Sequence, residues 1–409
     1  MICTVHQPSA ELFSQFDRLL LLKSGGREVY CGPIGPDGSA VARYFMSAAI
    51  DPKFYRPQPP DQVNVASWML DVVGAGTSAK GLIAPYDEVY RDSALRAENL
   101  AEVARLSVPA AGSSPVHFSS AYACSYATQL RLVLGRLGTV FWRDVSYVTT
   151  KVRVLLFLGL LIGLVFLGID DSDEAGLTSK VGIMGMSAGL FGIINSSSAL
   201  PLIFRLRESF YRERASHTYA PIVYSTSLAI VELPYLVVAT VAFVTPFYFL
   251  VGMKNEAGAF FQYTFVMYLC ALFFTYAGQL FASLLSNMQT ASIMQSVCIT
   301  IWFLFSGVFI NRGAMPEGWV FMYVLNPLSK VMVSLAIPQF YCADESPAGC
   351  PQLVSVQHGG VVSQWEFVSS YLASGKGWEW TYVGWLVVSI AVVRLLVAVS
   401  VQRVVHLTR

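Results

Sequence analysis

Few residues of this sequence have types and spacing that could carry chemistry. His6 ends a short apolar segment in TVHQPSAELF, residues 4–13, directly before a Pro8–Ser9 helix start. An imidazole there can hydrogen-bond a phosphate and a water molecule, although a histidine before a proline turn is usually an ordinary surface residue. No G-x-x-x-x-G-K-[ST] motif occurs, so the sequence offers no P-loop cradle or lysine for nucleotide phosphates. The seven cysteines form no C-x-x-C pair, which argues against a zinc or iron–sulfur centre.

The composition is that of a polytopic membrane protein. Of 409 residues, 55% are hydrophobic and 13% are charged, whereas about 25% of the residues in a soluble domain are charged. The net charge of +1 provides no general basic field, so no nucleic-acid partner is expected. The first residues lack the pattern of a secretory signal, and membrane insertion is therefore expected to rely on internal spans.

The first part of the chain resembles ordinary soluble sequence. Residues 1–110 carry charges at a normal frequency and contain no apolar run long enough to cross a bilayer. Within them, RLLLLKSGGREVYCG (18–32) predicts a strand, a Gly25-Gly26 turn and a second strand. Residues 111–147 are predicted to form a small-residue linker and then an amphipathic helix at the membrane edge.

The rest of the chain, 148–409, predicts a mainly α-helical membrane domain. From Ala257 to Asn311 no residue is charged, and a single helix of that length would measure about 82 Å against a hydrocarbon core of about 30 Å. That run must therefore hold two spans. Six spans are predicted in all, at about 148–169, 181–204, 222–251, 258–285, 289–310 and 381–402.

The basic residues orient these spans. Lys151 with Arg153, the arginines of RLRESFYRER and Arg403 with Arg409 fall on one side if the spans alternate, which makes both termini cytoplasmic. The segment 312–378 then lies outside the cell. Lys330, alone in an apolar stretch of it, suggests either short helices dipping back toward the membrane or a simple surface helix.

Several stretches together resemble one transporter family. CTVHQPSAELFSQFDRLLLLKSGGREVYCGPIG (3–35), WMLDVVGAG (68–76), YDEVYRDS (86–93) and WRDVSYVTTK (142–151) are similar to the G subfamily of ATP-binding cassette transporters, in its pleiotropic-drug-resistance branch. One departure is Asn64-Val65-Ala66-Ser67, where the family usually has Asn-Pro-Ala. The resemblance implies a type-2 ABC exporter fold with six spans, preceded in 1–110 by the C-terminal remnant of a nucleotide-binding domain.

The same resemblance assigns a role to His6 and limits what this chain does alone. His6 would be the switch histidine that senses the γ-phosphate of ATP. ATP and Mg²⁺ would act through the complete nucleotide-binding domains of the parent protein, and the chain alone, without a P-loop, is expected neither to bind nor to hydrolyse nucleotide. The simplest expectation is a fragment or truncated gene model of a half-transporter, or of the second half of a full one.

The basic segment RESFYRERASHTY, 207–219, would be the coupling helix between the nucleotide-binding domain and the spans. The resemblance implies that charged side chains pair with that domain and transmit its closure; they are Glu208, Arg212, Glu213 and Arg214. The alternative is that these charges only set the topology.

Two charged residues lie inside predicted spans, Glu232 and Arg394. Each costs a few kcal/mol at mid-bilayer, about 2.5–3.5 on insertion scales. We expect them either to pair or share a polar network, or to snorkel separately toward the cytoplasmic side.

Substrate contacts are expected on spans two and five. Phe191, Asn195 and Ser198 fall on one helical face, an aromatic and polar strip suited to amphipathic ligands. By resemblance, the fifth span faces a central cavity, with Ser296, Thr300 and Phe303 lining it, and Val308 and Phe309 match the apolar plug between inner and outer cavities. The alternative for each residue is ordinary packing between helices.

Cys342 and Cys350 lie in the predicted extracellular segment, and oxidising surroundings favour a disulfide between them, worth roughly 2–3 kcal/mol. No metal site is expected.

The functional prediction is ATP-driven export of amphipathic or lipid-like molecules from the plasma membrane. The expected partners are membrane lipid, nucleotide-binding domains and a second transmembrane domain, either in a homodimer or in the other half of a full-size protein. The alternatives are a passive channel or scramblase and a non-transporting regulatory fragment.

Overall fold

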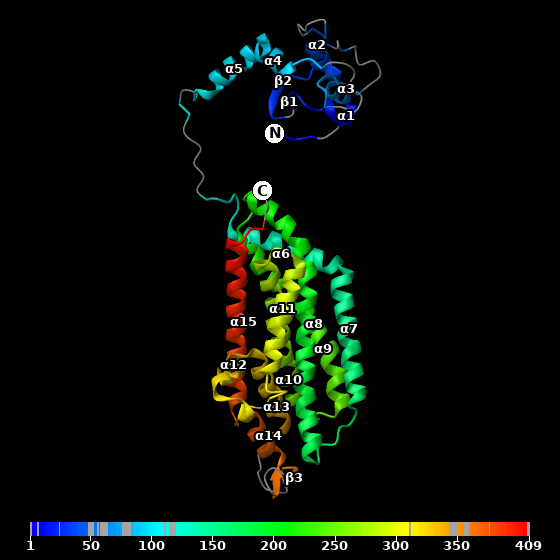
Figure 1. Ribbon diagram of the computed structural model, residues 1–409, viewed down its shortest axis with the longest axis vertical. Helices are drawn as coiled ribbons and strands as arrows, with labels where there is room; N and C mark the ends of the chain where they lie inside the picture. The colour runs from blue at the N-terminus through cyan, green and yellow to red at the C-terminus, as the bar shows by residue number, and fades with distance from the viewer. Residues whose placement is uncertain are drawn as a thin grey trace. The chain divides into compact units, whose positions relative to one another are not determined.

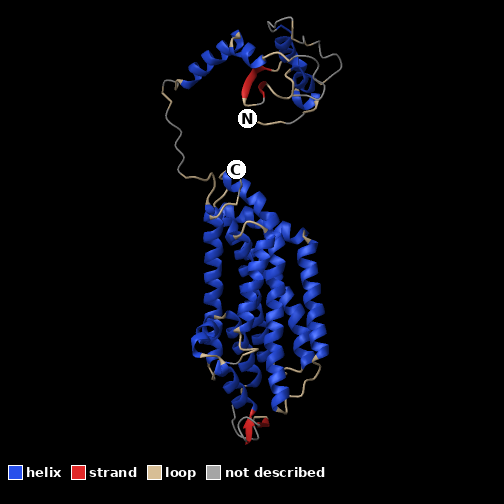
Figure 2. Cartoon of the chain, in the orientation of Figure 1, coloured by secondary structure: helices blue, strands red, loops and turns tan. Residues whose placement is uncertain are grey.

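The computed structural model divides the chain into two compact units, residues 1–117 and 118–409, which are described separately. The described residues are 2–5, 8–23, 25–47, 53–54, 57, 64–75, 83–109, 112–113, 120–310, 312–342, 350–355, 360–375 and 377–406. The division falls seven residues beyond the expected end of the first domain at 110, and the predicted amphipathic helix belongs to the second unit. Figure 2 shows that the second unit consists mainly of helices.

The N-terminal unit is built on an antiparallel hairpin of β1 (Arg18–Lys23) and β2 (Arg27–Pro33). Gly25 and Gly26 both have positive φ, which glycine adopts at no steric cost, and the predicted strand, turn and strand are therefore confirmed. Short helices surround the hairpin, namely α1 (Ala10–Phe13), η1 (Pro36–Gly38), α2 (Ser39–Ser47), α3 (Val65–Val72), α4 (Tyr86–Arg91) and α5 (Ala94–Ser107).

One carboxylate connects the hairpin to the helix that follows it. Asp87, at the start of α4, accepts from Lys23 Nζ at 3.2 Å and from Arg27 Nη1 at 3.0 Å. These contacts, the one to Arg27 above all, hold the pKa of Asp87 below its usual range. The hairpin and α4 are thereby held together by charge as well as by their apolar core, in which Val29, Val41 and Phe45 are completely buried.

The second unit is a helical bundle (Figure 1). It begins with α6 (Tyr126–Arg143), the predicted amphipathic helix. Among the described residues, five helices are long and apolar enough to cross a membrane, or six if one bent pair counts as a span. The five are α7 (Val145–Val165), α8 (Glu174–Ala215), α9 (Pro221–Val251), α10 (Ala257–Leu284) and α15 (Trp378–Arg403). Helix α7 packs on α9, α8 packs on α10, and α10 packs on α15.

Small residues let these helices approach closely. A Cβ placed on Gly159 of α7 would lie 2.4 Å from the carbonyl oxygen of Phe243 in α9. On Gly278 of α10 it would lie 2.5 Å from the carbonyl oxygen of Ser196 in α8. Close backbone contact of this kind is a main source of attraction between membrane helices, since burying apolar surface from lipid yields little.

The predicted spans differ from the helices in three places. The first, expected at 148–169, ends at Val165, and Gly168 takes a positive φ of 58° in the turn that follows. The second, expected at 181–204, extends from Glu174 to Ala215, because its charged residues continue the helix with their side chains at the polar end. The fifth, expected at 289–310, is α11 (Met288–Leu304) of 17 residues, shorter than the other five. It stops where Gly307 adopts a φ of 96°, which no α-helix accommodates.

The segment expected as an extracellular loop, 312–378, is largely structured. It contains η2 (Arg312–Ala314), η3 (Glu317–Trp319), α12 (Val320–Leu325), α13 (Pro327–Phe340), the strands β3 (Gln352–Ser355) and β4 (Gly360–Ser363), and α14 (Gln364–Leu372). The segments Glu317–Leu325 and Pro327–Phe340 meet at an angle of 76°. The short helices expected around Lys330 are therefore present, and that lysine is buried between the rings of Tyr323 and Tyr382.

Candidate functional site

The polar end of α8 bonds to several neighbouring helices. It carries the arginines of RLRESFYRER, and three of these reach different neighbours. Arg205 pairs with Asp144, which joins α6 to α7. Arg207 donates to carbonyls at the end of α10, to Ala282 at 3.0 Å and Leu285 at 2.6 Å.

Arg214 binds the end of α15 in the same manner. Its guanidinium donates to the carbonyl oxygens of Val401 at 3.1 Å and Gln402 at 2.5 Å. The last carbonyls of a helix lack intrahelical partners and carry partial negative charge. An arginine from α8 therefore satisfies the C-terminus of α15, and Arg207 does so for α10.

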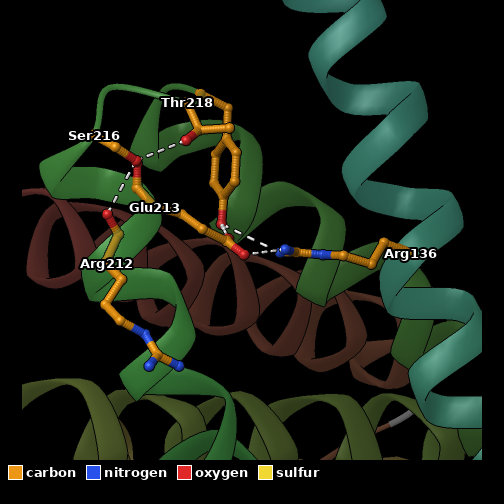
Figure 3. Close-up of polar contacts among 6 residues, drawn as sticks. Arg136, Arg212, Glu213, Ser216 and Thr218 are labelled. Atoms are coloured by element: carbon orange, nitrogen blue, oxygen red, sulfur yellow. Dashed lines mark hydrogen bonds and ion pairs between the residues drawn. The ribbon is translucent and has the colours of Figure 1, made fainter. Parts of the chain in front are cut away.

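A third connection joins α8 to α6 (Figure 3). Arg136 of α6 forms an ion pair with Glu213, and the hydroxyl of Tyr219 donates to the same carboxylate. Arg136 Nη2 also lies 3.3 Å from that hydroxyl. The hydrogen bond to Glu213 raises the pKa of Arg136, and burial raises the pKa of the Tyr219 phenol. The guanidinium therefore stays charged and the phenol stays protonated at any physiological pH.

The four residues expected to face a nucleotide-binding domain are in two different situations. Glu213 and Arg214 bond inside the second unit, to Arg136 and to the end of α15, and their pairing with a nucleotide-binding domain stays a prediction. Glu208 and Arg212 are exposed, and within the described part of the chain neither side chain forms a hydrogen bond or ion pair. Figure 3 shows the Arg212 guanidinium pointing away from Glu213.

The two charged residues of the spans share one polar network without touching. Glu232 of α9 is completely buried, and Tyr147 of α7 donates to both of its carboxyl oxygens, at 2.9 and 3.0 Å. Gln279 of α10 donates to Glu232 at 3.5 Å and accepts from Arg394 of α15 at 2.7 Å. Gln279 thus bridges the acid of α9 and the base of α15, and Tyr147 adds α7 to the network.

Arg394 has further partners that hold it inside the bundle. Its Nη2 donates to the carbonyl oxygen of Ser225 at 2.6 Å and to the hydroxyl of the same residue at 3.0 Å. The guanidinium also lies 4.7 Å from the ring centroid of Tyr276, a cation–π arrangement. A buried guanidinium with this many partners does not need to reach the membrane surface.

The strip expected on the second span turns inward. Phe191 is completely buried, and its ring centroid lies 4.9 Å from that of Phe243 in α9. Asn195 is also buried and donates to the carbonyl oxygen of Phe191 at 2.8 Å. Neither residue faces an open surface of the unit. Ser198 is only partly buried and lines a cleft toward α7.

The residues expected on the fifth span divide between surface and core. Ser296 and Thr300 lie on an exposed face of α11 and bond only to carbonyls of the preceding turn. Phe303 packs toward α8, where a Cβ on Gly189 would lie 2.2 Å from its ring. Val308 packs similarly against Gly185, whereas Phe309 is exposed, with its ring edge against Phe303.

Two further expectations concern single positions. Cys342 and Cys350 are joined by a disulfide, with their Cα atoms 5.6 Å apart. His6 lies outside the described residues.

Several residues of these networks were not singled out by the sequence analysis. Tyr147, Gln279 and Tyr219 are ordinary in type, and nothing in the sequence shows what they contact. A usable signal existed for Gln279, since it is one of few strongly polar residues in the uncharged run from 257 to 311. Arg136 was counted only as part of an amphipathic face.

Comparison with known proteins agrees with this architecture. A family model described as ABC-2 type transporter matches residues 128–340, and a second model with the same description matches 6–79. ABC transporter G family member 36 of Arabidopsis thaliana is 35% identical over 342 residues, 83% of this chain and 23% of that protein. Pleiotropic drug resistance protein 1 of Nicotiana tabacum is 34% identical with the same coverage.

A third relative extends the match along nearly the whole chain. ABC transporter G family member 53 of Oryza sativa subsp. japonica is 31% identical over 394 residues, 96% of this chain and 26% of that protein. The chain spans about a quarter of the length of the curated relatives it matches. The match to residues 128–340 covers more than half of the 409 residues, and the chain therefore belongs to the ABC-2 type transporter family, as a multi-pass membrane domain of the G-family, pleiotropic-drug-resistance type.

Proposed function

We propose that this chain supplies a substrate-translocating membrane half of an ATP-driven exporter of amphipathic or lipid-like small molecules. The observation that carries the proposal is the bonded end of α8 in a domain of this family. Arg207 and Arg214 join α8 to the ends of α10 and α15, and Glu213 joins it to Arg136 within α6. A force applied at this end is therefore shared by four helices, as coupling to another domain requires.

The proposed point of attachment is the exposed pair Glu208 and Arg212. Both charges are free within the described part of the chain, and charged contacts at an interface rim can re-pair between two arrangements. A nucleotide-binding domain that engages them would act on α8, while Glu213 and Arg214 pass the movement to the neighbouring helices.

ATP and Mg²⁺ are assigned to those nucleotide-binding domains. The 409 residues contain no P-loop, the element whose backbone amides and lysine hold nucleotide phosphates. The residues present do not fit ATP, and no step of the mechanism is derived through nucleotide on this chain. His6 is the residue proposed to sense the γ-phosphate beside a complete cassette.

The second partner is another transmembrane domain, with α11 as the proposed wall of a shared cavity. Its exposed face combines the hydroxyls of Ser296 and Thr300 with the apolar side chains of Ile293 and Val297. A face of mixed polarity suits amphipathic substrates. Phe309, exposed beyond the end of α11, is the proposed plug with Val308 behind it.

The proposed location is the plasma membrane, with both termini in the cytoplasm. Protease or epitope mapping in sealed cells tests this topology, and termini on opposite faces would contradict it. For activity, the gene is disrupted in the source cells, and ATP-dependent uptake of rhodamine 6G and a fluorescent phospholipid into inside-out membrane vesicles is compared with and without complementation. Loss of vanadate-sensitive uptake, restored by the gene but not by a Glu208→Arg, Arg212→Glu double variant, supports the proposal. Uptake that persists without ATP would instead indicate a passive pathway.

A further inference from the structure

A cleft of about 390 Å³ opens between α7 and α8. Its lining combines two basic side chains, four hydroxyls and apolar surface; among these residues are Lys151, Arg205, Tyr147, Thr150, Ser197, Ser198 and Val154. Small-molecule sites in proteins have this size and this combination of apolar walls with a few polar groups. Ser197 of this lining accepts from Gln295 of α11 at 2.9 Å, but no residue of α11 lines the cleft itself.

Lys151 is the unusual member of this lining. It is only 6% exposed, and its ammonium has a single hydrogen bond in the described part of the chain, to the Tyr147 hydroxyl at the long distance of 3.5 Å. The Tyr147 hydroxyl donates its hydrogen bond to Glu232, which is not part of the cleft lining. An ammonium carries three donors, and a buried charge is costly unless it is paired. Lys151 therefore lines the cleft with donors to spare.

Arg205 supplies the second positive charge. One nitrogen pairs with Asp144, and the guanidinium has five N–H donors in all. Glu232, behind Tyr147, attracts Lys151, but its single negative charge is shared with Arg394 of α15. Lys151, Arg205 and Arg394 together therefore exceed Asp144 and Glu232 by one positive charge. An anion between the two basic side chains would restore the balance.

An apolar track continues from the cleft along the outside of α7. Val154 lines the cleft and is also exposed, and Phe157 and Leu161 follow it at helical spacing on the same face, both exposed. Exposed apolar side chains are ordinary on a helix that meets lipid. Here, however, the exposed apolar row begins at the cleft that contains Lys151. A ligand whose anionic group lies beside Lys151 could therefore place an alkyl chain along this row.

We propose that the α7–α8 cleft binds an anionic amphiphile, with a phosphate-type head group between Lys151 and Arg205 and its alkyl chain along Val154, Phe157 and Leu161. The hydroxyls of Thr150 and Ser197 are the additional polar groups of the head-group site. This site is separate from the substrate surface proposed on α11, and its occupation does not depend on ATP or on transport.

The test uses the full chain purified in a neutral maltoside detergent, with radiolabelled dodecyl phosphate as the probe in equilibrium binding. Saturable binding to the wild type is expected, and Lys151→Gln weakens it by about tenfold, the scale of one lost charge-assisted hydrogen bond. Lys330→Gln is the matched control, because Lys330 is also a buried lysine but lies outside the cleft. It should bind the probe like the wild type.

Two competitors separate the possible sources of the signal. Unlabelled dodecanol, which has the chain without the charge, should displace the probe at least about tenfold less well than dodecyl phosphate. Sodium phosphate, which has the charge without the chain, should also compete poorly. Equal competition by dodecanol overturns the anion site, and equal competition by sodium phosphate overturns the amphiphile and leaves a free-anion site.

A folding defect in the lysine variant does not end the test. Arg205→Gln changes a mostly exposed side chain and should also weaken binding, while size-exclusion profiles report whether each variant is folded. Wild-type affinity in both Lys151→Gln and Arg205→Gln would overturn the proposal. Because no nucleotide is present, this failure is distinguishable from a failure of the transport proposal.

Discussion

Removing one hydroxyl from the buried network measures how strongly it holds the bundle together. Tyr147→Phe deletes the donor that reaches both carboxyl oxygens of Glu232 and leaves Gln279, at 3.5 Å, as the remaining hydrogen-bond partner. Hydrogen bonds to charged groups contribute about 1.5–3 kcal/mol in soluble proteins, and those between membrane helices about 0.6, with a maximum of about 1.7. Because Glu232 is completely buried, we expect a loss near the upper membrane value, about 1.5 kcal/mol.

Thermal unfolding of the purified chain in detergent, followed by tryptophan fluorescence at a fixed scan rate, measures this loss. At about 2–4 °C per kcal/mol for a domain of this order of size, Tyr147→Phe should lower the Tm by about 3–6 °C. Glu232→Gln and the double variant complete a cycle, and the double loss should fall short of the sum by about 1 kcal/mol. The control is Tyr235→Phe, because that ring packs 5.9 Å from Phe141 and its hydroxyl has no hydrogen bond in the described residues.

Two results would refute this reasoning. Strict additivity of Tyr147→Phe and Glu232→Gln would show that the hydroxyl and the carboxyl do not interact. An equal fall in Tm for Tyr235→Phe would show that the assay responds to any lost tyrosine hydroxyl, whatever its partner.

The remaining predictions concern helix contacts. Gly159→Ala should lower stability by about 1–3 kcal/mol, because the added Cβ would lie 2.4 Å from the Phe243 carbonyl oxygen. The control is Gly138→Ala in α6, which has open space around it and should be neutral or stabilising by up to about 1 kcal/mol. Equal Tm changes in the two variants would contradict the close contact at Gly159. Arg136→Glu and Glu213→Arg should each destabilise by about 1 kcal/mol, a value kept small because the two side chains are 43% and 24% exposed. Combining them should recover most of the loss in Tm, and no recovery would show that the ion pair contributes little.

The hydrophobic pattern predicted the helices well and their ends less well. Long apolar runs, uncharged in α10 and interrupted only by Glu232 in α9, identified both helices almost to the residue, because the length of such a run reports directly on a span. The end of α11 is followed by the turn at Gly307, where φ is positive and an added Cβ would lie 3.1 Å from the Tyr323 ring. The charged end of α8 was expected to be a separate helix, but it continues α8. Charged residues mark where a span leaves the membrane, and they do not mark where the helix ends.

The candidate site was harder to predict, because periodicity identifies a helical face but not the neighbour it meets. Phe191 and Asn195 do share a face, and that face turns toward α9 and α10. The connection between Glu232 and Arg394 required a third residue, Gln279, on another helix. Packing against neighbouring helices determines how each helix is rotated about its own axis, and a single sequence does not show which helices are neighbours.

Helix α8 has 42 residues without a break, so as a straight rod it is about 63 Å long, twice the thickness of the hydrocarbon core at about 30 Å. A rod of that length works as a lever, and tilting it by about 5° about one end displaces the other end by about 5 Å. Since Arg207 and Arg214 fasten the polar end of the lever to α10 and α15, those helices must follow it. The stiffness has one weak point at Pro201, the only proline in α8, where a backbone hydrogen bond is missing. Bending at Pro201 therefore determines how much of a displacement at one end of α8 reaches the other end.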